Sequence, residues 1–469
     1  MEHLQLFLRF ISVFFVAYAF LYLIQWMAAM IAAFQRLSRC EENQQLACRL
    51  YPVSRLREHS VSVIIPACNE EACIVETVEG LLRSEYPSLE ILVVDDGSKD
   101  HTARRMIRTF HLKKVKLSPH AQALRTQRVR QCYTAQVKGR RITLLCKDNG
   151  GKGDALNCGF SYASSPYCLV VDADTVVRPG AIRLMVSRFL VDPSTIVCAG
   201  AVGTRMRSQE DDQSLGLFQK MLVLFQRMEY YRTFYIHRVF FDRLNANIIV
   251  SGAFALFDRD ILIQAGGYRT DTIGEDMELT MRLHAFCMSQ HQTYRIAYVP
   301  EARCDTQLPF HLVDYYRQRR RWHIGLAQSL HQHLYMIGRH YYGWVGVLSV
   351  LFMAIYELLS PLIEVAGLVF LLLAAWAGSL GVGSAIAISV AYFLFSLLTQ
   401  SLLLAALRGY RIEHIGWREH LQLMAVAATE VFLFHPINVF IKLATLFTYR
   451  RYRATWHHIR RVDDNGKNA

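Results

Sequence analysis

Two aspartates separated by one residue, Asp172 and Asp174, are the side chains whose spacing first suggests chemistry. They follow the apolar run 167–171, which has the length and composition of a short buried strand. In an open α/β sheet, ligands gather at the carboxyl ends of the strands. Two carboxylates released there can hold a hard divalent cation, and such a cation bridges phosphate oxygens. Taken alone, the pattern is better explained by a solvated turn, so its interpretation depends on the rest of the chain.

A glycine-rich turn that contains one lysine precedes this pair. Lys152 lies between Gly151 and Gly153, after the expected strand 142–145 and before a stretch of helix-forming residues. The N-terminus of a helix that follows a flexible turn is suited to binding a diphosphate. The spacing does not match the P-loop pattern, which disfavours hydrolysis of a nucleoside triphosphate.

Two further acids, Glu275 and Asp276, stand at the start of an expected helix over residues 277–286. A carboxylate there can act as a general base toward a hydroxyl group, a role typically worth ~10²–10⁴ in rate. Acids at a helix N-terminus are also stabilised by the helix dipole. Capping alone is therefore an alternative explanation for Asp276.

The elements that must position these residues predict an α/β fold. The runs 61–66 and 90–94 are expected strands, and a helix is expected between them over residues 69–83. Strand, helix and strand at this spacing form a βαβ unit and hence a parallel sheet. A further strand is expected over residues 248–257, where the small residues around Gly252 allow a close backbone approach.

Polar residues also follow the first two expected strands. Pro66 and Glu70 lie at the end of the first strand, and Asp95 and Asp96 at the end of the second. Asp95 and Asp96 are thus charged residues at the edge of the sheet, like Lys152 and Asp172.

The two ends of the chain are apolar and predict a membrane protein. Residues 4–34 are long enough for one transmembrane helix, and the arginines after it predict a cytoplasmic flank. Four later apolar runs cover residues 344–359, 362–376, 385–407 and 421–447. The second and third are the expected spans, whereas charged residues in the first and last also suit a position in the membrane interface.

Composition narrows the class of partner. The formal net charge of the 469-residue chain is +13, which suits a nucleotide, phospholipid headgroups or nucleic acid, but no nucleic-acid motif is present. Residues 101–146 contain no acid and many basic residues, as expected of a solvated insertion or of a surface for headgroups or a polyanion. The eleven cysteines lack paired metal spacing, so we expect reduced core residues in a cytosolic domain and no zinc site.

One more pattern, Gln318-x-x-Arg321-Trp322, closes the soluble block just before the membrane runs. With the acids and the lysine in this order, the sequence resembles the family 2 glycosyltransferases, which are inverting enzymes of GT-A fold. Within that family it looks like the membrane-embedded cellulose, chitin, hyaluronan and poly-N-acetylglucosamine synthases, and is most similar to the last. The resemblance covers about residues 61–322 and extends to the flanking helices.

The resemblance implies a role for each of these residues. It implies that Asp276 is the general base that deprotonates the acceptor hydroxyl, and that Asp172 and Asp174 hold Mg²⁺ or Mn²⁺ on the donor diphosphate. The implied donor-binding residues for a UDP-sugar are Pro66, Glu70, Asp95, Asp96, Lys152 and Asp172. The implied acceptor-binding residues are Glu275, Gln318, Arg321 and Trp322, with Arg321 also close to the diphosphate.

The resemblance also implies a domain organisation. The expected units are an N-terminal transmembrane helix (1–36), a cytoplasmic GT-A domain of mixed, mainly parallel sheet (55–325), C-terminal transmembrane and interfacial helices (340–450) and a basic cytoplasmic tail (451–469).

Elementary chemistry is consistent with these roles. Inverting transfer needs one base and a leaving group whose charge is neutralised, and UDP leaves as an anion without a general acid. Trp322 could instead belong to an interfacial aromatic belt, and Arg319 and Arg320 are expected at the surface or on headgroups. Gln307 stands where close relatives are expected to have an acid, which puts any role of this position in question.

The expected function is therefore transfer of a sugar from a UDP-sugar to a growing polysaccharide, at the bacterial inner membrane with the catalytic domain in the cytoplasm. The expected partners are the donor, a saccharide or lipid-linked acceptor and membrane lipids, with room for an accessory subunit and no nucleic acid. One alternative is single transfer to a lipid acceptor. Another is a non-catalytic membrane scaffold with a transferase-like domain, although the intact acids at 172, 174 and 276 argue against it.

Overall fold

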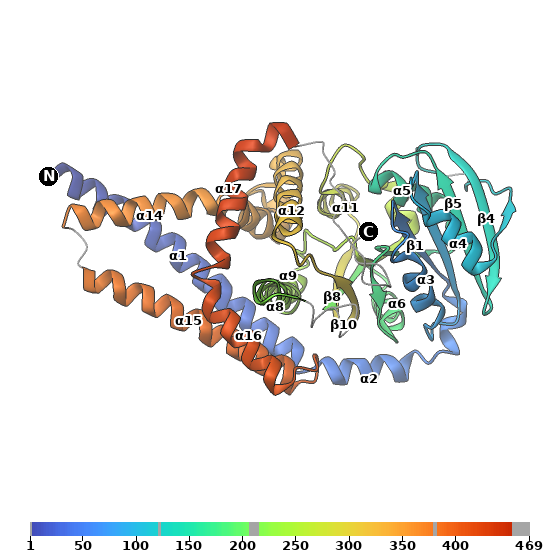
Figure 1. Cartoon of the computed structure of the whole chain (residues 1–469), viewed down its shortest axis with the longest axis horizontal. Helices are drawn as coiled ribbons and strands as arrows, with labels where there is room; N and C mark the ends of the chain where they lie inside the picture. The colour runs from blue at the N-terminus through green and yellow to red at the C-terminus, as the bar shows by residue number, and fades with distance from the viewer. Residues whose placement is uncertain (1, 121–122, 206–214, 379–381, 453–469) are drawn as a thin grey trace.

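The computed structural model describes residues 2–120, 123–205, 215–378 and 382–452. An α/β domain forms one end of the molecule, and three long helices extend from the other end (Figure 1): α1 (Glu2–Leu37), α14 (Ser360–Trp376) and α15 (Val382–Gly409). Helices α12 (Leu312–Gln332) and α17 (Phe434–Tyr452) lie between the two parts.

Within the described residues, ten strands form one sheet in the order β3-β4-β5-β2-β1-β6-β9-β8-β10-β7. The strands are β1 (Val61–Ala67), β2 (Leu89–Asp96), β3 (Lys113–Val115), β4 (Val129–Val137), β5 (Arg140–Lys147), β6 (Tyr167–Val171), β7 (Val176–Val177), β8 (Thr195–Arg205), β9 (Phe254–Asp258) and β10 (Arg295–Gln307). The four central strands β5-β2-β1-β6 are parallel, and so is the pair β8/β10, whereas the other neighbours are antiparallel. The predicted α/β fold with a mixed, mainly parallel sheet is confirmed, and its four central strands are the parallel ones.

Helix α5 (Lys152–Tyr162) follows the glycine-rich turn and packs closely on the centre of the sheet. A Cβ atom at Gly159 would lie 2.2 Å from Cγ2 of Ile64 on β1, so only glycine allows this approach. The close packing brings the first turn of α5, with Lys152, to the carboxyl ends of the parallel strands. The flanking helices of this half are α3 (Ile74–Leu82), α4 (Thr102–Phe110) and α6 (Ala181–Val191).

Two local predictions differ from the structure. The first helix begins at Ile74 rather than residue 69, because Asn69 has a φ of 58°, which a right-handed helix does not allow. The strand expected over 248–257 begins only at Phe254. The backbone N–H groups of Val250 and Gly252 donate instead to side chains of helix α11 (Glu275–Ser289), so this segment follows the helix and not the sheet.

The apolar helices identify a membrane protein. Among the described helices, Phe10–Leu37 and Ser389–Gly409 are long and apolar enough to cross a membrane. Two further pairs, Val345–Leu358 with Ser360–Trp376 and Trp417–Glu430 with Phe434–Tyr452, are each bent by 54° and would raise the number to four if each pair is one span.

The two bent pairs change the predicted spans. The expected span 362–376 is the second helix of a bent pair that begins at Val345. The run 421–447 forms two helices, α16 (Trp417–Glu430) and α17. A proline lies in the first turn after each break, Pro361 in α14 and Pro436 in α17. Proline has no N–H to donate to the preceding turn, which favours a new helix start at each place. The tail expected over 451–469 lies almost entirely outside the described residues.

The core of the α/β domain is continuous from the sheet to the inner part of α1, which includes the buried Trp26 and Met30. All eleven cysteines are free, and eight of them are buried, as expected of small apolar core residues.

The basic insertion predicted over residues 101–146 contains α4, β3, β4 and most of β5. Figure 1 shows α4, β4 and β5 at the end of the molecule opposite α14 and α15. This position disfavours contact with the headgroups around those helices and leaves the solvated insertion or a soluble polyanion as explanations.

Candidate active site

A cavity of about 1840 Å³ extends from the carboxyl ends of the central strands to the membrane helices. Eleven of the twelve predicted site residues line it: Pro66, Glu70, Asp96, Lys152, Asp172, Asp174, Glu275, Asp276, Gln318, Arg321 and Trp322. Asp95 is the exception. It is buried, its Oδ1 accepts the backbone N–H of Ser98, and burial raises the pKa of its carboxyl. Of the two acids after β2, Asp96 is therefore the one that faces the cavity.

Asp96 fixes the glycine-rich turn at the donor end of the cavity. Its two carboxylate oxygens accept the backbone N–H groups of Gly150 and Gly151 at 2.9 and 2.8 Å. The same carboxylate pairs with Lys147, which also contacts Asp154 at 2.6 Å, and all three side chains are almost fully buried. A buried charge network of this kind holds the turn in one conformation, with the N-terminus of α5 directed at the cavity.

Asp172 and Asp174 follow β6 and line the cavity. Lys152 contacts Asp172 at 2.7 Å and Glu275 at 3.8 Å. Burial lowers the pKa of Lys152, but the two carboxylates outweigh burial and raise it above its ordinary value. The Asp174 carboxylate accepts the hydroxyl of Thr306 at 3.1 Å.

These residues fit a divalent cation bound together with a diphosphate. No group of three or more His, Cys, Asp and Glu side chains with metal-binding geometry occurs among the residues that the structure describes. Two carboxylates at one strand end leave the remaining positions of an oxygen-loving cation to ligand oxygens or water, as is usual for Mg²⁺ at phosphate sites. Lys152 supplies a second positive charge at the same place.

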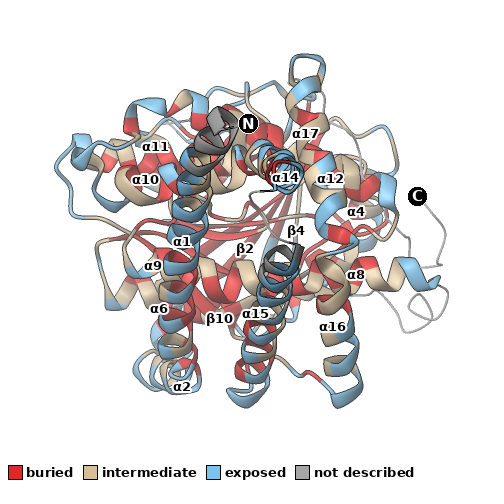
Figure 2. Ribbon diagram, turned by 90° about the vertical axis from the view of Figure 1, so that its left-hand side faces the viewer, coloured by how far each residue is buried: buried red, intermediate tan, exposed pale blue. Residues whose placement is uncertain are grey.

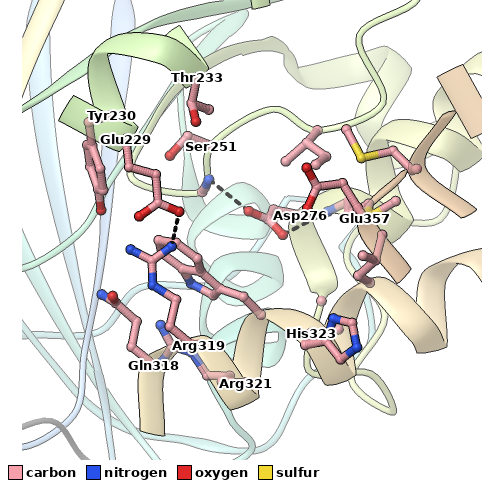
Figure 3. Close-up of a pocket in the computed structure, with 18 of the residues that line it drawn as sticks. Glu229, Tyr230, Thr233, Ser251, Asp276, Gln318, Arg319, Arg321, His323 and Glu357 are labelled. Carbon is pink, nitrogen blue, oxygen red and sulfur yellow. Dashed lines mark hydrogen bonds and ion pairs between the residues drawn. The ribbon is translucent and has the colours of Figure 1, made fainter. Parts of the chain in front are cut away.

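Asp276 lies in the first turn of α11, and both of its carboxylate oxygens accept backbone hydrogen bonds. Oδ1 accepts the N–H of Met277 at 2.8 Å and Oδ2 accepts the N–H of Gly252 at 3.2 Å (Figure 3). The residue that caps α11 is Gly274, and no side chain caps this helix. Asp276 is therefore not the N-cap residue, but its bond from the Met277 N–H and its place in the first turn still stabilise the start of α11. Its side chain also lines the cavity, so both interpretations of Asp276 fit the structure.

Glu275 is the acid beside the predicted base. Burial raises its pKa to about 7, although Lys152 acts in the opposite direction and Asp276 adds to the rise. A carboxyl group with this pKa exchanges its proton near neutral pH, which suits a residue at a site of proton transfer.

Helix α12 carries the acceptor-end residues predicted from sequence. Gln318, Arg321 and Trp322 all line the cavity, and 42% of Trp322 is exposed. Figure 3 shows Gln318, Arg319 and Arg321 on this helix below Asp276. The prediction that Arg319 and Arg320 lie at the surface is wrong, because both are buried. Arg319 lines the cavity, and Arg320 stacks on Tyr452 with its guanidinium carbon 3.9 Å from the ring centre.

The strand end that departs from the expected pattern also borders the cavity. Gln307, at the end of β10, lines it, and its buried side-chain N–H₂ has no hydrogen-bond partner among the described residues. The neighbouring Asp305 forms a bidentate pair with Arg178 at 2.6 and 2.8 Å. The nearest acid on this strand is therefore committed to a structural pair.

Sequence reasoning missed one wall of the cavity. Helix α8 (Leu217–Arg232) and the π-helical turn Thr233–His237 contribute Glu229, Tyr230, Thr233 and His237. Figure 3 shows Glu229, Tyr230 and Thr233 on the side of the cavity opposite Glu357. A single sequence gives little sign of them, because their helix has no glycine turn, paired acids or other pattern of chemistry. On the membrane side of the cavity, the sequence offered one signal of a site, namely charged residues such as Glu357 within apolar runs.

Comparison with known proteins identifies the family of the chain. Residues 62–266 match the glycosyl transferase family 2, and residues 167–410, more than half of the chain, match the glycosyl transferase family group 2. Poly-β-1,6-N-acetyl-D-glucosamine synthases of Staphylococcus aureus and Staphylococcus epidermidis are 28% identical over 265 residues, which are 56% of this chain and 54% of each relative. The chain thus spans about half the length of the curated relatives it matches.

A solved structure shares the fold. It is a mannosyltransferase from Pyrobaculum calidifontis in complex with GDP-Man and Mn²⁺, with a TM-score of 0.50 and 21% identity. The match covers 87% of this chain and 99% of that chain. At this identity the likeness establishes the GT-A fold.

Proposed function

This chain belongs to the glycosyl transferase family group 2, and we propose that it is a membrane-bound inverting enzyme that transfers a sugar from a UDP-sugar to a growing polysaccharide. The family makes the chain a glycosyltransferase. The donor, the polymeric acceptor and the roles of individual residues are our proposal. The relatives named for poly-β-1,6-N-acetyl-D-glucosamine synthesis make UDP-N-acetylglucosamine the first donor to test.

The observation that carries the proposal is one cavity that joins the donor acids to the membrane helices. It is lined at one end by Asp172 and Asp276 and at the other by Tyr18, Tyr22 and Tyr392 of α1 and α15. Aromatic side chains with a polar tip combine an apolar face with a hydrogen-bonding group. A cavity of this volume and lining is suited to a chain of several sugar units.

In the proposed reaction, Asp276 accepts the proton of the attacking acceptor hydroxyl. Its hydrogen bonds from Gly252 and Met277 hold the carboxylate in place for that role. Asp172 and Asp174 would hold a divalent cation, Mg²⁺ or Mn²⁺, which would neutralise the charge that develops on the leaving nucleotide. Lys152 and Arg321 supply further positive charge, so no general acid is needed.

The alternative acceptor is a lipid. Leu23, Met27 and Phe395 of the membrane helices also line the cavity and could contact an acyl chain. A lipid acceptor would receive one sugar, so the length of the product separates the two proposals. The non-catalytic scaffold is disfavoured, because the acids expected of a working enzyme line one cavity.

We also propose that the α/β domain faces the cytoplasm of a bacterial inner membrane, as the arginines after α1 suggest. In this arrangement residues 55–325 form the catalytic unit and 340–450 the membrane and interfacial unit. This arrangement leaves room for an accessory subunit, which transfer activity would then require.

The test is release of nucleotide by the purified full-length protein in detergent. The donors are UDP-N-acetylglucosamine, UDP-glucose and UDP-glucuronic acid, with GDP-mannose as a comparison, each with Mg²⁺ or Mn²⁺. Turnover of one UDP-sugar with a long product supports the proposal, and a single sugar on lipid moves the function to the alternative. Turnover of GDP-mannose alone, or none with a folded protein in native membranes, would contradict it.

A further inference from the structure

The guanidinium of Arg319 is stacked on aromatic rings of its own helix. Its central carbon lies 4.5 Å from the ring centre of Trp322 and 4.8 Å from that of Tyr315. These residues are three and four positions away along α12 and therefore share one face of the helix. One face of the Trp322 indole is thus covered by Arg319, and a sugar ring that stacks on Trp322 must use the other face.

Glu229 of helix α8 holds Arg319 in this position. The two side chains form an ion pair between α8 and α12 (Figure 3). The Arg319 side chain is 9% exposed and that of Glu229 is 26% exposed, so the acid is the more accessible member. The pair crosses the cavity wall beside Gln318 and Trp322 rather than lying in a packed core.

The pair leaves hydrogen-bonding capacity unused. Among the described residues, no partner contacts the following buried atoms: Nε and Nη2 of Arg319, Oε2 of Glu229 and Oε1 of Gln318. Buried polar atoms in proteins are normally hydrogen-bonded, so unpartnered atoms that line a cavity are candidates for contact with a ligand. Four such atoms in three residues that line one cavity indicate a ligand that both donates and accepts hydrogen bonds, reached after small side-chain rotations.

The charges disfavour the donor diphosphate as this ligand. Glu229 would repel an anion, and the cation that contacts Asp172 at the donor end is a different residue, Lys152. A neutral molecule with many hydroxyl groups satisfies both the carboxylate and the guanidinium, and its apolar ring face suits the free face of an indole. A saccharide has both properties.

We infer that Glu229 and Arg319 bind the acceptor saccharide, with its sugar ring on the free face of Trp322 and its hydroxyls on the unused atoms of the pair. This inference rests on the proposed function, because it assumes that the acceptor is a saccharide. It assigns to Arg319 a second role, which is to hold the indole in the orientation that the sugar meets.

The direct test is binding of a β-1,6-linked N-acetylglucosamine hexasaccharide to the full-length protein, measured by calorimetry without donor. We expect Glu229→Gln, which keeps the shape and removes the charge, to weaken binding about tenfold or more. Arg319→Lys keeps the charge but removes the planar guanidinium, which stacks on the indole and can form two parallel hydrogen bonds. We therefore expect a similar loss of binding. Thermal unfolding of each variant checks that it is folded.

The matched control is Glu419→Gln. Glu419 of α16 pairs with Arg227, which lies on α8 as Glu229 does. Neither Glu419 nor Arg227 lines the cavity. Loss of binding in Glu229→Gln and Arg319→Lys with wild-type binding in the control would support the inference. Equal binding by all variants, an equal loss in the control, or no binding by the wild type would overturn it.

A second measurement separates this inference from the proposed function. In a transfer assay with the same hexasaccharide as acceptor, Glu229→Gln should raise the acceptor KM about tenfold and change the donor KM less than twofold. A donor KM that rises equally would contradict a role at the acceptor. If no donor is turned over but the hexasaccharide binds and Glu229→Gln abolishes binding, the proposed function fails while the saccharide site stands.

Discussion

Gly274, which precedes helix α11, packs against Gly325 of helix α12 with their backbones in contact. A Cβ atom added to Gly274 would lie 2.8 Å from Cα of Gly325, and one added to Gly325 would lie 2.9 Å from Cα of Gly274. The Gln328 side chain strengthens the contact, because its Oε1 accepts the backbone N–H of Ile273 at 2.8 Å. The contact fixes the helix that carries the proposed base against the helix that carries the acceptor residues.

We therefore expect Gly325→Ala to separate the two helices. Overpacking of this kind costs about 1–3 kcal/mol, and the shift would move Asp276 away from the acceptor bound at Trp322. Thermal unfolding in detergent should show a lower Tm, and sugar transfer should fall more than nucleotide binding. Gly409→Ala at the end of α15 is the control, since a Cβ atom there meets nothing within 4 Å. An unchanged Tm and turnover would contradict the close contact.

Asp276→Asn should abolish transfer while the protein stays folded. The amide cannot accept a proton from the acceptor, and loss of a general base typically lowers the rate by ~10²–10⁴. Its N–H₂ group would also oppose the backbone N–H of Gly252 or Met277. Steady-state turnover and donor affinity are the measurements, with the exposed Asp260→Asn on α10 (Arg259–Gln264) as control. Turnover within threefold of wild type would exclude Asp276 as the base.

Removal of divalent cations should stop donor turnover. Asp172 and Asp174 provide only two carboxylates, so we expect a weakly held cation that EDTA removes and that added Mn²⁺ or Mg²⁺ restores. Asp174→Asn should raise the cation concentration needed for half-maximal turnover by at least tenfold. Full activity in EDTA, or an unchanged cation requirement in Asp174→Asn, would show that the two aspartates do not hold a cation.

The sequence could predict that the proposed donor-binding residues lie together, because the signal is local. Asp96, Lys152 and Asp172 each follow an apolar strand within a few residues, and parallel strands end at one edge. The same reasoning failed for residues 248–253, whose backbone hydrogen bonds depend on side chains of α11 that are distant in sequence.

The residues proposed to bind the acceptor were found only where a recognised pattern existed. Gln318, Arg321 and Trp322 belong to that pattern, whereas Arg319 within it was expected at the surface. Its burial depends on Glu229, which lies ninety positions away. Gly325 shows the same limit, because nothing near it in sequence indicates that it contacts Gly274. Contacts between residues that are far apart in the chain cannot be predicted from the local pattern of a single sequence.

Asp96→Asn should weaken both the fold and donor binding. Lys147 is fully buried and would lose part of its charge compensation, and removal of one partner of a buried pair typically costs about 3–5 kcal/mol. The glycine turn would lose a charged acceptor for Gly150 and Gly151, so the donor KM should rise. Asp148→Asn is the control, because its pair with Arg130 is exposed and should matter little. A variant as stable as the control would contradict this role of Asp96.

His284 should make the protein less stable in mild acid. It is fully buried in α11, its Nε2 lies 2.9 Å from the carbonyl oxygen of Asn247, and its Nδ1 lies 2.7 Å from the hydroxyl of Tyr294. A carbonyl can only accept, so Nε2 carries the proton and Nδ1 accepts from the tyrosine. This arrangement suits the neutral ring, and burial lowers the pKa of His284 to about 4.

The sign of the effect follows from this pKa. Between about pH 6.5 and pH 4 the unfolded chain binds a proton at His284 that the folded protein does not, so the free energy of unfolding falls as the pH falls through this range. The full loss is on the order of 3 kcal/mol. Thermal unfolding of the wild type and of His284→Gln at pH 7.5, 6.0 and 5.0 is the measurement. The variant should have a lower Tm at pH 7.5 because its hydrogen bonds are poorer, and a smaller decrease in Tm on acidification. An equal decrease in both proteins would show that other groups cause the acid sensitivity.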